Sequence, residues 1–381
     1  MTAICRNGIL PTALRSPTLP YAEGVIIMTE MHASAVSGAH IPKALWRCAK
    51  AAARDTALLY FIPLLVVFSD SAAESVRESL KMCASALVPS LFPYLVLTAL
   101  ISRCGTAERI GRAIGQPFAM LFGLPGSLAF SFIIGLCAGY PAGAAAVCEA
   151  YRGGRCTADE AERGCALLNN TGPGLTVALL GTALLGDRRL GIIIYLAQLL
   201  SVLTLGALHG RIHNIGKRKK ENKLGNISVG RRERHDKSSS PSTASPSVLR
   251  ILPESVASAL SATLTVVSLV TVFSLLRVLA AALLDRASVS LTGAAMPSVV
   301  PLLLSMLLEV SGGLGSAATF GGTLGTVLCG AEIGWSGLCV TMQTKTLIRG
   351  CGLSGKYIIP VRAAMAVLCA GYTFLLLYIA G

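Results

Sequence analysis

The stretch GYPAG at residues 139–143 interrupts a long apolar segment of this chain, and a second interruption, NNTGPG, follows at residues 169–174. Proline removes a backbone donor and glycine weakens a helix, so both motifs predict helix breaks. Inside a membrane such a break exposes backbone N–H and C=O groups that no water satisfies. The two motifs are therefore expected where protein, a ligand or a wet cavity supplies the missing partners.

The composition around these motifs is that of an integral membrane protein. Of the 381 residues 53% are hydrophobic and only 14% are charged. Most of the net charge of +14 lies in one central loop and at the ends of apolar segments, as the positive-inside rule requires, so nucleic acid is not an expected partner and membrane lipid is. The 12 cysteines stand singly without metal-ligand spacing, which favours small packing residues over a metal site.

Composition divides the chain into five segments. They are a disordered cytoplasmic extension (1–55), a short apolar stretch that spans only if it borrows neighbours (56–70), a first transmembrane repeat (71–210), a basic cytoplasmic linker (211–250) and a second transmembrane repeat (251–381). The linker is rich in Lys and Arg and ends in a Ser- and Pro-rich tract, which is typical of a flexible cytoplasmic connection.

Counting charges outward from the linker predicts the topology. Residues 127–150 begin and end on the cytoplasmic side, which makes them a re-entrant helical hairpin with its tip at 139–143. The residues from 127 to 138 form roughly 18 Å of helix, too short for a hydrocarbon core of about 30 Å. Residues 296–330 form a second hairpin that enters from outside. The fold class is therefore an all-α polytopic membrane protein, an inverted repeat of two halves that each hold a re-entrant hairpin and a broken helix.

Within the first half, two interpretations of the motif residues stay open. Gly135, Gly139 and Gly143 recur at every fourth position, which is also typical of a surface where helices pack closely. Asn169 and Asn170 favour a functional site, because polar side chains are costly in mid-membrane. The sequence Thr157 to Glu160 predicts a helix start of the capping-box type in the polar stretch between the motifs.

In the second half, Glu309 precedes a Ser-Gly-Gly sequence at the place that corresponds to the first motif. It could carry a coupling proton, bind Na+ or accept hydrogen bonds from a substrate, or it could cap a neighbouring helix break. Gln343 occupies the position that Asn169 and Asn170 hold in the first half. No Lys or Arg is evident inside the apolar segments to pair with a dianion.

The predicted substrate site lies between the two hairpin tips at mid-membrane. Its residues are Gly139, Tyr140, Pro141, Gly143, Asn169, Asn170, Thr171, Gly172, Glu309, Ser311, Gly312 and Gln343. Catalytic residues, metal ligands and cofactors are not expected, apart from a coupling proton or Na+. The phosphate-loop pattern at 350–356 lacks its Ser or Thr because Tyr357 follows, so the chain is not expected to be an enzyme.

The GYPAG motif, the NNTGP break and the sequence Leu308-Glu309-Val310 together resemble the sporulation integral membrane protein YlbJ family, over residues 75 to 380. These are nucleoside-recognition (Gate) domain membrane proteins of endospore formers. The resemblance implies transport of dipicolinic acid across the outer forespore membrane. It also implies kinship with concentrative nucleoside transporters, whose fold has two inverted repeats with re-entrant hairpins.

Three functions follow as expectations. The first is a secondary transporter for a small organic anion, with dipicolinate held by half-helix N-termini and by Asn169, Asn170 and Thr171. The second is a nucleoside-type transporter, and the third is a non-transporting scaffold or signalling protein of the spore envelope. The expected location is the cell membrane, and the outer forespore membrane during sporulation. A homo-oligomer and a monomer are both compatible with the sequence.

Overall fold

A computed structural model describes residues 41–224, 248–294 and 297–380, and these residues form helices and connecting turns without any strand. The chain divides into two units, residues 1–69 and residues 70–381. In the first unit the described part is the 27-residue helix α2 (Ile41–Val67). Because α2 begins at Ile41, residues 41–55 of the predicted cytoplasmic extension are helical. Residues 1–40 of this extension, where disorder is expected, lie outside the described residues.

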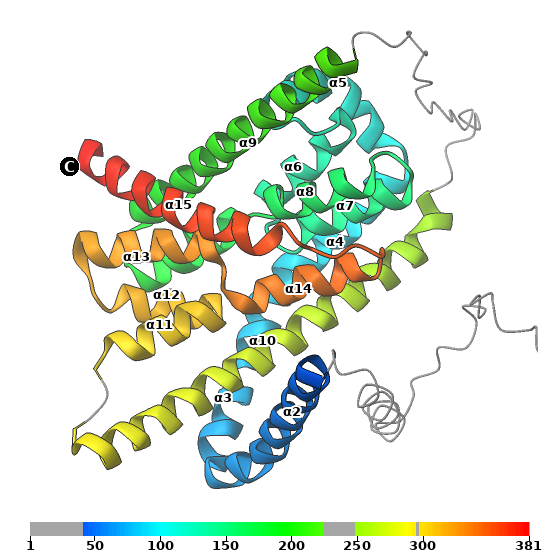
Figure 1. Cartoon of the computed structure of the whole chain (residues 1–381). Helices are drawn as coiled ribbons and strands as arrows, with labels where there is room; N and C mark the ends of the chain where they lie inside the picture. Colours follow the sequence, from blue (N-terminus) through cyan, green and yellow to red (C-terminus); the bar gives the residue numbers. More distant parts are fainter. Residues whose placement is uncertain (1–40, 225–247, 295–296, 381) are drawn as a thin grey trace, which may run out of the picture. The chain divides into compact units, whose positions relative to one another are not determined.

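The first half of the second unit contains the helices α3 to α9, with α5 to α8 close together (Figure 1), and the helices are interrupted at the two predicted motifs. Its elements are α3 (Ser69–Met82), η1 (Cys83–Leu87), α4 (Val88–Arg103), α5 (Thr106–Phe122), η2 (Gly126–Leu128), α6 (Ala129–Cys137), α7 (Ala142–Arg152), α8 (Ala158–Leu167), the π-helix η3 (Gly174–Leu184) and α9 (Arg188–Leu224). The breaks fall between α6 and α7 and between α8 and η3. The predicted capping box is confirmed, since Thr157 and Glu160 cap the start of α8.

The second half also has two breaks, one between α11 and α12 and one between α13 and α14. Its elements are α10 (Val248–Thr292), α11 (Val299–Leu308), α12 (Val310–Ala318), α13 (Gly322–Trp335), α14 (Gly337–Arg349) and α15 (Ile358–Ala380). The first break is Glu309, whose φ of −149° is extended backbone. The second is Ser336, which adopts the left-handed region at φ 69° and is followed by Gly337 at φ 72°.

The helices differ from the predicted boundaries at four places. The expected loop 103–126 holds the amphipathic helix α5, whose apolar side packs on α6 and α9. Helix α9 continues to Leu224 inside the predicted linker, most of which lies outside the described residues, and α10 continues through the expected polar gap at 285–295 to Thr292. Helix α13 crosses the predicted boundary at residue 330, so the broken pair is shorter than predicted and covers residues 299–318.

Several helices are long and apolar enough to cross a membrane. Within the described part of the chain four qualify by length and composition, Arg188–Ile212, Val248–Leu291, Gly322–Arg349 and Ile358–Ala380, and the number rises to 6 if each of two bent pairs counts as one span. One of these pairs, Thr106–Phe122 with Gly126–Cys137, bends by 107°. Helix α10 is longer than any membrane requires, at about 1.5 Å per residue.

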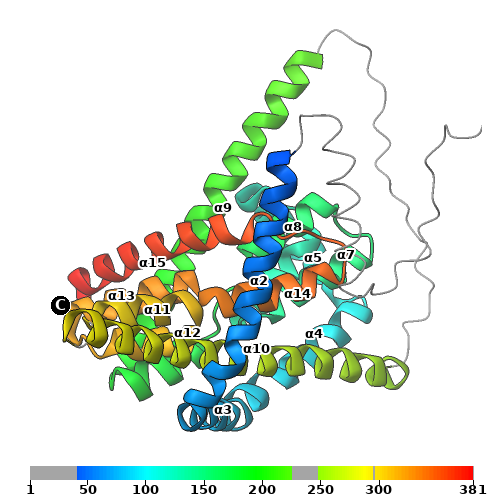
Figure 2. The same cartoon turned by 60° about the horizontal axis from the view of Figure 1, so that its bottom comes forward.

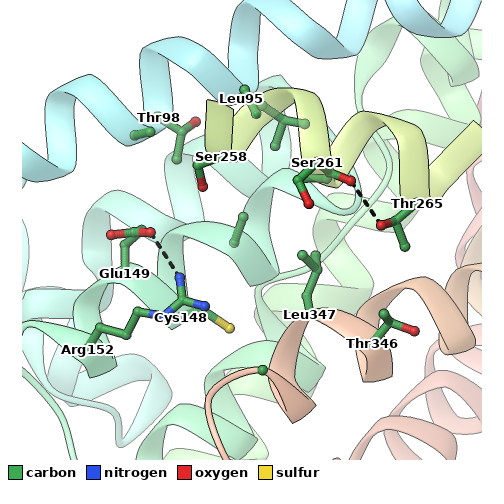
Figure 3. A pocket seen from close by; sticks show the side chains of 15 residues that line it. Leu95, Thr98, Cys148, Glu149, Arg152, Ser258, Ser261, Thr265, Thr346 and Leu347 are labelled. Carbon is green, nitrogen blue, oxygen red and sulfur yellow. Dashed lines mark hydrogen bonds and ion pairs between the residues drawn. The ribbon is translucent and has the colours of Figure 1, made fainter. Parts of the chain in front are cut away.

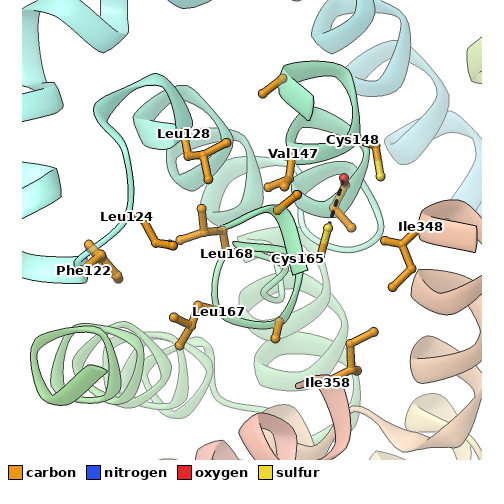
Figure 4. Close-up of a cluster of buried hydrophobic side chains, with 14 of the residues drawn as sticks. Phe122, Leu124, Leu128, Val147, Cys148, Cys165, Leu167, Leu168, Ile348 and Ile358 are labelled. Carbon is orange, nitrogen blue, oxygen red and sulfur yellow. Dashed lines mark hydrogen bonds between the residues drawn. The ribbon is translucent and has the colours of Figure 1, made fainter. Parts of the chain in front are cut away.

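Helices α9, α13 and α15 of the second unit pack on one another, whereas α10 packs on α4, α11 and α14. Helix α9 lies beside α15, and α15 lies beside α13, while α4 lies along α10 (Figures 1 and 2). A cluster of buried side chains from α5 to α8, α14 and α15 forms a core on one side of the first break, with Leu128, Val147, Leu168 and Ile348 fully enclosed (Figure 4). This core packs against α6 and α7, which flank the first break, and against α8, which precedes the second break.

Candidate functional site

The two breaks of the first half pack directly on each other. Gly139, at φ 81°, lies so close to Gly172 that a methyl group on it would sit 2.7 Å from the Gly172 nitrogen. A methyl group on Gly172 would in turn sit 3.1 Å from the Cys137 carbonyl oxygen. Only glycine permits this approach, so the motifs at 139–143 and 169–174 form one structural unit although they lie on separate helices.

The neighbouring glycines of the first motif serve close packing. A methyl group on Gly135 or Gly143 would overlap the carbonyl oxygen of Leu168, and the two glycines also face each other across α6 and α7. The packing interpretation of the four-residue glycine spacing is therefore confirmed for these two positions. Their role is to let three backbone segments meet.

The second half contains a similar contact between its breaks. A methyl group on Gly337 would lie 3.2 Å from the Glu309 nitrogen, so the α13–α14 break packs on the α11–α12 break. Within the broken pair, a methyl group on Gly313 would lie 2.9 Å from the Met306 Cα. Each half thus has a broken helix pair whose interruption rests on the interruption of the next helix.

Asn169 joins the two halves and caps a helix. Its Oδ1 accepts a hydrogen bond from the Ala144 N–H at 3.3 Å, in the first turn of α7, and its Nδ2 donates to the Thr344 hydroxyl at 2.9 Å. All the side-chain polar atoms of Asn169 are therefore engaged. Thr344 lies on α14, one turn beyond Val340, to whose carbonyl its hydroxyl donates.

Glu309 caps the helix that it precedes. One carboxylate oxygen accepts from the Ser311 N–H at 2.8 Å, and the other accepts from the Gly312 N–H at 2.7 Å. Of the interpretations that the sequence left open, the geometry shows the capping role. Ser311 and Gly312, which were predicted as ligands, contribute their backbone N–H groups to this cap.

These caps change the expected mode of anion recognition. The N–H groups of the first turns of α7 and α12 bind Asn169, Glu309 and backbone carbonyls. At α7, the half-helix after the first motif, the expectation of N–H groups free for a substrate is therefore wrong, and at α12 Glu309 fills the corresponding place. No side chain of the described residues caps η3, the half-helix after the second motif, so the prediction for its N-terminus stays open. Recognition of charge beside α7 and α12 has to come from other groups.

Such groups lie next to the breaks and are enclosed in the protein. Among the buried side-chain polar atoms without a hydrogen-bond partner in the described residues, we group those of six side chains at or near the breaks of both halves and name this set the buried polar centre. The atoms are Tyr140 Oη, Asn170 Oδ1, Thr171 Oγ1, Gln198 Oε1, both Glu332 carboxylate oxygens and Arg362 Nη2. Leaving one buried polar atom unpaired costs about 1–3 kcal/mol, so a set of them points to a ligand.

Tyr140 connects the members of this centre. Its side chain interacts with the charges of Arg362 and Glu332 and lies beside the hydroxyls of Thr171 and Ser336, although no hydrogen bond of ordinary geometry joins them. Gln198, on α9, donates to the Thr171 carbonyl at 2.9 Å, which fixes the second motif against the long helix. The centre therefore lies where the breaks of both halves meet.

Arg362 and Glu332 are the charged members, and the sequence reasoning missed both. Arg362 is 3% exposed on α15 and Glu332 is 0% exposed on α13, in helices that are long and apolar enough to span a membrane. The expectation that no Arg lies inside the apolar segments is therefore wrong. The sequence does carry a signal for both residues, because each is a single charge within an apolar run. A charged residue inside a membrane segment usually belongs to a functional site.

A second arginine lies near the other break. A methyl group on Gly312 would sit 2.6 Å from Arg277 Nε, so the Arg277 side chain crosses the first turn of α12. The carboxylate of Glu332 lies on the next residue, since a methyl group on Gly313 would be 2.7 Å from its Oε1. The glycines after Glu309 therefore make room for two charged side chains.

Gln343 is not part of a break. It lies in the middle of α14, seven positions after Ser336, and donates from Nε2 to the Cys339 sulfur at 3.2 Å. The position that corresponds to the second motif is occupied by Ser336 and Gly337, which were not predicted. A left-handed serine gives no clear sequence signal, because serine is common in unbroken membrane helices as well.

A separate cavity of about 290 Å³ lies among α4, α7, α10 and α14 (Figure 3). Its wall carries the hydroxyls of Thr98, Ser258, Ser261 and Thr346, and the ion pair of Glu149 with Arg152 at 3.1 Å. None of the predicted site residues lines it. It shares helices α7 and α14 with the breaks but is distinct from the buried polar centre.

A pair of acidic residues ties α8 to the turn before α15. Glu162 Oε1 accepts hydrogen bonds from the Ser354 N–H at 2.8 Å and from its hydroxyl at 2.7 Å, and Asp159 accepts from the Tyr357 hydroxyl at 3.0 Å. Burial alone would raise the pKa of both carboxyls, but the hydrogen bonds from Ser354 lower the pKa of Glu162, and the hydrogen bond from Tyr357 and the Arg163 charge lower that of Asp159. This link joins the two halves outside the apolar helices.

Fold and site together define a multi-pass helical membrane protein with a buried, charged polar centre. The chain is similar to the sporulation integral membrane protein YlbJ of Bacillus subtilis (strain 168), with 24% identity over 148 residues, which make up 39% of this chain and 36% of that protein. The similarity thus spans well under half of either chain, and it confirms the resemblance that the motifs indicated. No family model and no solved structure matches the chain.

Proposed function

We propose that this protein is a secondary transporter for a small organic anion, which binds at the buried polar centre. One observation carries the proposal: the guanidinium of Arg362 is enclosed with an unpartnered Nη2 beside the hydroxyls that surround Tyr140. A planar guanidinium presents paired N–H donors that match a carboxylate. An anion bound at this place would give the buried Nη2 of Arg362 the hydrogen-bond partner that it lacks.

Dipicolinate fits this centre in chemistry. It carries two carboxylates for Arg362 and for the hydroxyls of Tyr140 and Thr171, and its role rests on the similarity to a sporulation membrane protein. The similarity to a sporulation integral membrane protein supports a membrane location, and we extend the proposal to the outer forespore membrane on the family resemblance of the motifs. Because the centre is enclosed, substrate enters only after the helices around it rearrange, as alternating access requires.

The arrangement of the breaks supports an inverted repeat. Each half pairs a broken helix hairpin with the break of the following helix, and both contacts depend on a glycine with positive φ, Gly139 and Gly337. We propose that 127–150 and 299–318 are re-entrant hairpins that enter from opposite faces, as in concentrative-nucleoside-transporter-like folds. Helices α9 and α15, which lie side by side, then close the two repeats.

A binding measurement tests the proposed site. Purified protein in detergent is titrated with dipicolinate in a calorimeter, and the expected loss in Arg362→Gln is about 10- to 100-fold, since a hydrogen bond to a charged group contributes about 1.5–3 kcal/mol. Arg362→Lys keeps the charge and is expected to bind with intermediate affinity. Arg349→Gln, an exposed arginine on α14, is the matched control and should bind as the unaltered protein does. Equal affinity in all four proteins would exclude Arg362 from the site.

A nucleoside-type substrate is the second candidate. The unpartnered Asn170 Oδ1 and Gln198 Oε1 are acceptors of the kind that recognise amino and imino groups of a base. Uridine added in excess during the dipicolinate titration separates the two. Competition by uridine together with loss of binding in Gln198→Ala would favour the nucleoside, whereas no competition favours the anion.

A further inference from the structure

The buried polar centre contains one more charged group than anion binding needs. Glu332 lies on α13 with both carboxylate oxygens unpartnered among the described residues, and it faces the same tyrosine as Arg362 does. A carboxyl group that is buried without hydrogen-bond donors is far more stable as the neutral acid than as the anion. The centre is thus built to hold a proton on Glu332 while Arg362 stays available.

Glu309, the other buried carboxylate, has a different environment. Both of its oxygens accept backbone N–H groups of α12, so it serves the fold and has no free oxygen for exchange. Glu332 has no such donors, although its carboxylate lies against Gly313 in the same helix. The two acids therefore divide into a structural one and an exchangeable one.

An ionised Glu332 and a bound anion would compete for the positive charge of Arg362. If Glu332 loses its proton, the centre holds a buried carboxylate whose charge, like that of Arg362, acts on Tyr140. Because opposite charges attract each other in a poorly screened interior, this carboxylate is drawn toward Arg362. A substrate carboxylate and the Glu332 carboxylate cannot both be neutralised by one guanidinium. Substrate binding is therefore favoured while Glu332 is protonated and disfavoured once it is ionised.

We propose that Glu332 carries the proton that accompanies the anion through the protein, and that its carboxylate competes with the substrate for Arg362. This inference rests on the proposed transport function. In the loaded state the acid is neutral and the anion sits on Arg362. On release the carboxyl O–H bond breaks, the proton passes to water on the receiving side, the new carboxylate pairs with Arg362, and the anion leaves.

The other titratable groups around Glu332 do not replace it in this role. Those that act on it or feel its charge are Glu309 at the start of α12, Tyr140 between α6 and α7, and Cys329 on its own helix. Arg362 approaches from α15, and α9 contributes the uncharged Gln198 to the centre. Arg277, from α10, crosses the first turn of α12 at Gly312, next to the glycine that the Glu332 carboxylate touches, and its guanidinium stays charged throughout. Among these, Glu332 alone has a carboxyl group without a donor.

Proton counting tests the inference directly. Dipicolinate is added to purified protein in a weakly buffered solution that contains a pH indicator, at a pH just above that at which Glu332 loses its proton in the substrate-free protein and at which the unaltered protein still binds the anion. The unaltered protein should take up about one proton per anion bound, whereas Glu332→Gln should bind the anion and take up none, because the amide is permanently neutral. Glu149→Gln, in the separate cavity and outside the buried polar centre, is the matched control and should keep the uptake. Uptake that persists in Glu332→Gln, or binding that requires Na+ without proton uptake, would overturn the proposal.

A second measurement keeps this test separate from the proposed substrate. A hydrophobic carbodiimide reacts with protonated carboxyls in apolar surroundings, and mass spectrometry locates the adduct. We expect labelling at Glu332, falling as the pH is raised, in the absence of any substrate. If dipicolinate binds no variant but Glu332 is labelled in this way, the substrate assignment fails and the proton site stands. If Glu332 remains unlabelled at every pH while the protein is folded, the proton site fails.

Discussion

At the scale of single residues, the tightest approach at any glycine of the described residues is that of Gly135 to a backbone carbonyl. Gly135 leaves no room for a methyl group beside the Leu168 oxygen, and Leu168 directly precedes the second motif. A larger side chain would push α6 away from the break and shift Asn169, which caps α7 through its side chain. The position of the second motif therefore depends on the absence of a side chain at Gly135 as well as on the hydrogen bonds of Asn169.

Gly135→Ala is expected to destabilise the protein by about 1–3 kcal/mol, the usual cost of overpacking a dense core. Thermal unfolding in detergent, followed by a fluorescent thiol reagent, measures it. Gly315→Ala on α12 is the control, because a methyl group there meets nothing within 4 Å, and it should unfold at or above the temperature of the unaltered protein. If both variants unfold together, the close approach to Leu168 does not hold the break.

At the scale of elements, the helix breaks are stabilised by partners from elsewhere in the chain. Asn169 reaches α7 and α14, and Gln198 on α9 fixes the carbonyl of Thr171. Glu162 likewise connects two elements, because its carboxylate on α8 accepts a hydrogen bond from the Ser354 N–H in the turn before α15. Short helices that could not persist alone are thus held by side chains of their neighbours.

Acid should loosen the link between α8 and the turn before α15. The folded pKa of Glu162 lies below its ordinary value of 4.5 and that of Asp159 below 3.8, so their stabilising effect is complete above those values. It is lost as the pH falls through the lowered folded pKa values, because both carboxyls must then be protonated. Glu162→Gln should be less stable at neutral pH and should lose less stability between neutral pH and pH 3 or so.

Urea unfolding of both proteins across this pH range is the measurement. Glu149→Gln serves as the control, because its ion pair with Arg152 lies within one helix and does not bridge the halves. A neutral-pH stability of Glu162→Gln equal to that of the unaltered protein would show that the hydrogen bonds from Ser354 contribute nothing.

The sequence predicted the breaks and their neighbours better than it predicted their purpose. Glycine and proline mark a break by their covalent structure, so 139–143 and 169–174 were found, and Glu309 was found as an isolated acid. Whether the Glu309 carboxylate caps a helix or faces a substrate depends on whether the N–H groups of Ser311 and Gly312 point toward it. The sequence alone does not reveal the direction of these N–H groups. Glu332 and Arg362 were passed over because each stands in an apolar run without a motif.

At the scale of the whole molecule, the proposed inverted repeat places corresponding loops on opposite faces of the membrane. The turn between α7 and α8 holds the partly exposed Cys156, and the turn after α12 holds the exposed Thr319. In oriented cells, a membrane-impermeant thiol reagent should reach Cys156 only from the cytoplasm and Thr319→Cys only from outside, with other accessible cysteines removed. Labelling of both from one face would contradict the opposite entry of the two hairpins.

The central claim is that an anion crosses the protein by way of Arg362. Proteoliposomes that contain the unaltered protein should accumulate labelled dipicolinate faster when the outside is more acidic than the inside, and Arg362→Gln should reduce the rate at least about tenfold. Arg349→Gln, reconstituted in equal amount, should transport normally. Uptake by Arg362→Gln that equals uptake by the unaltered protein would contradict the account.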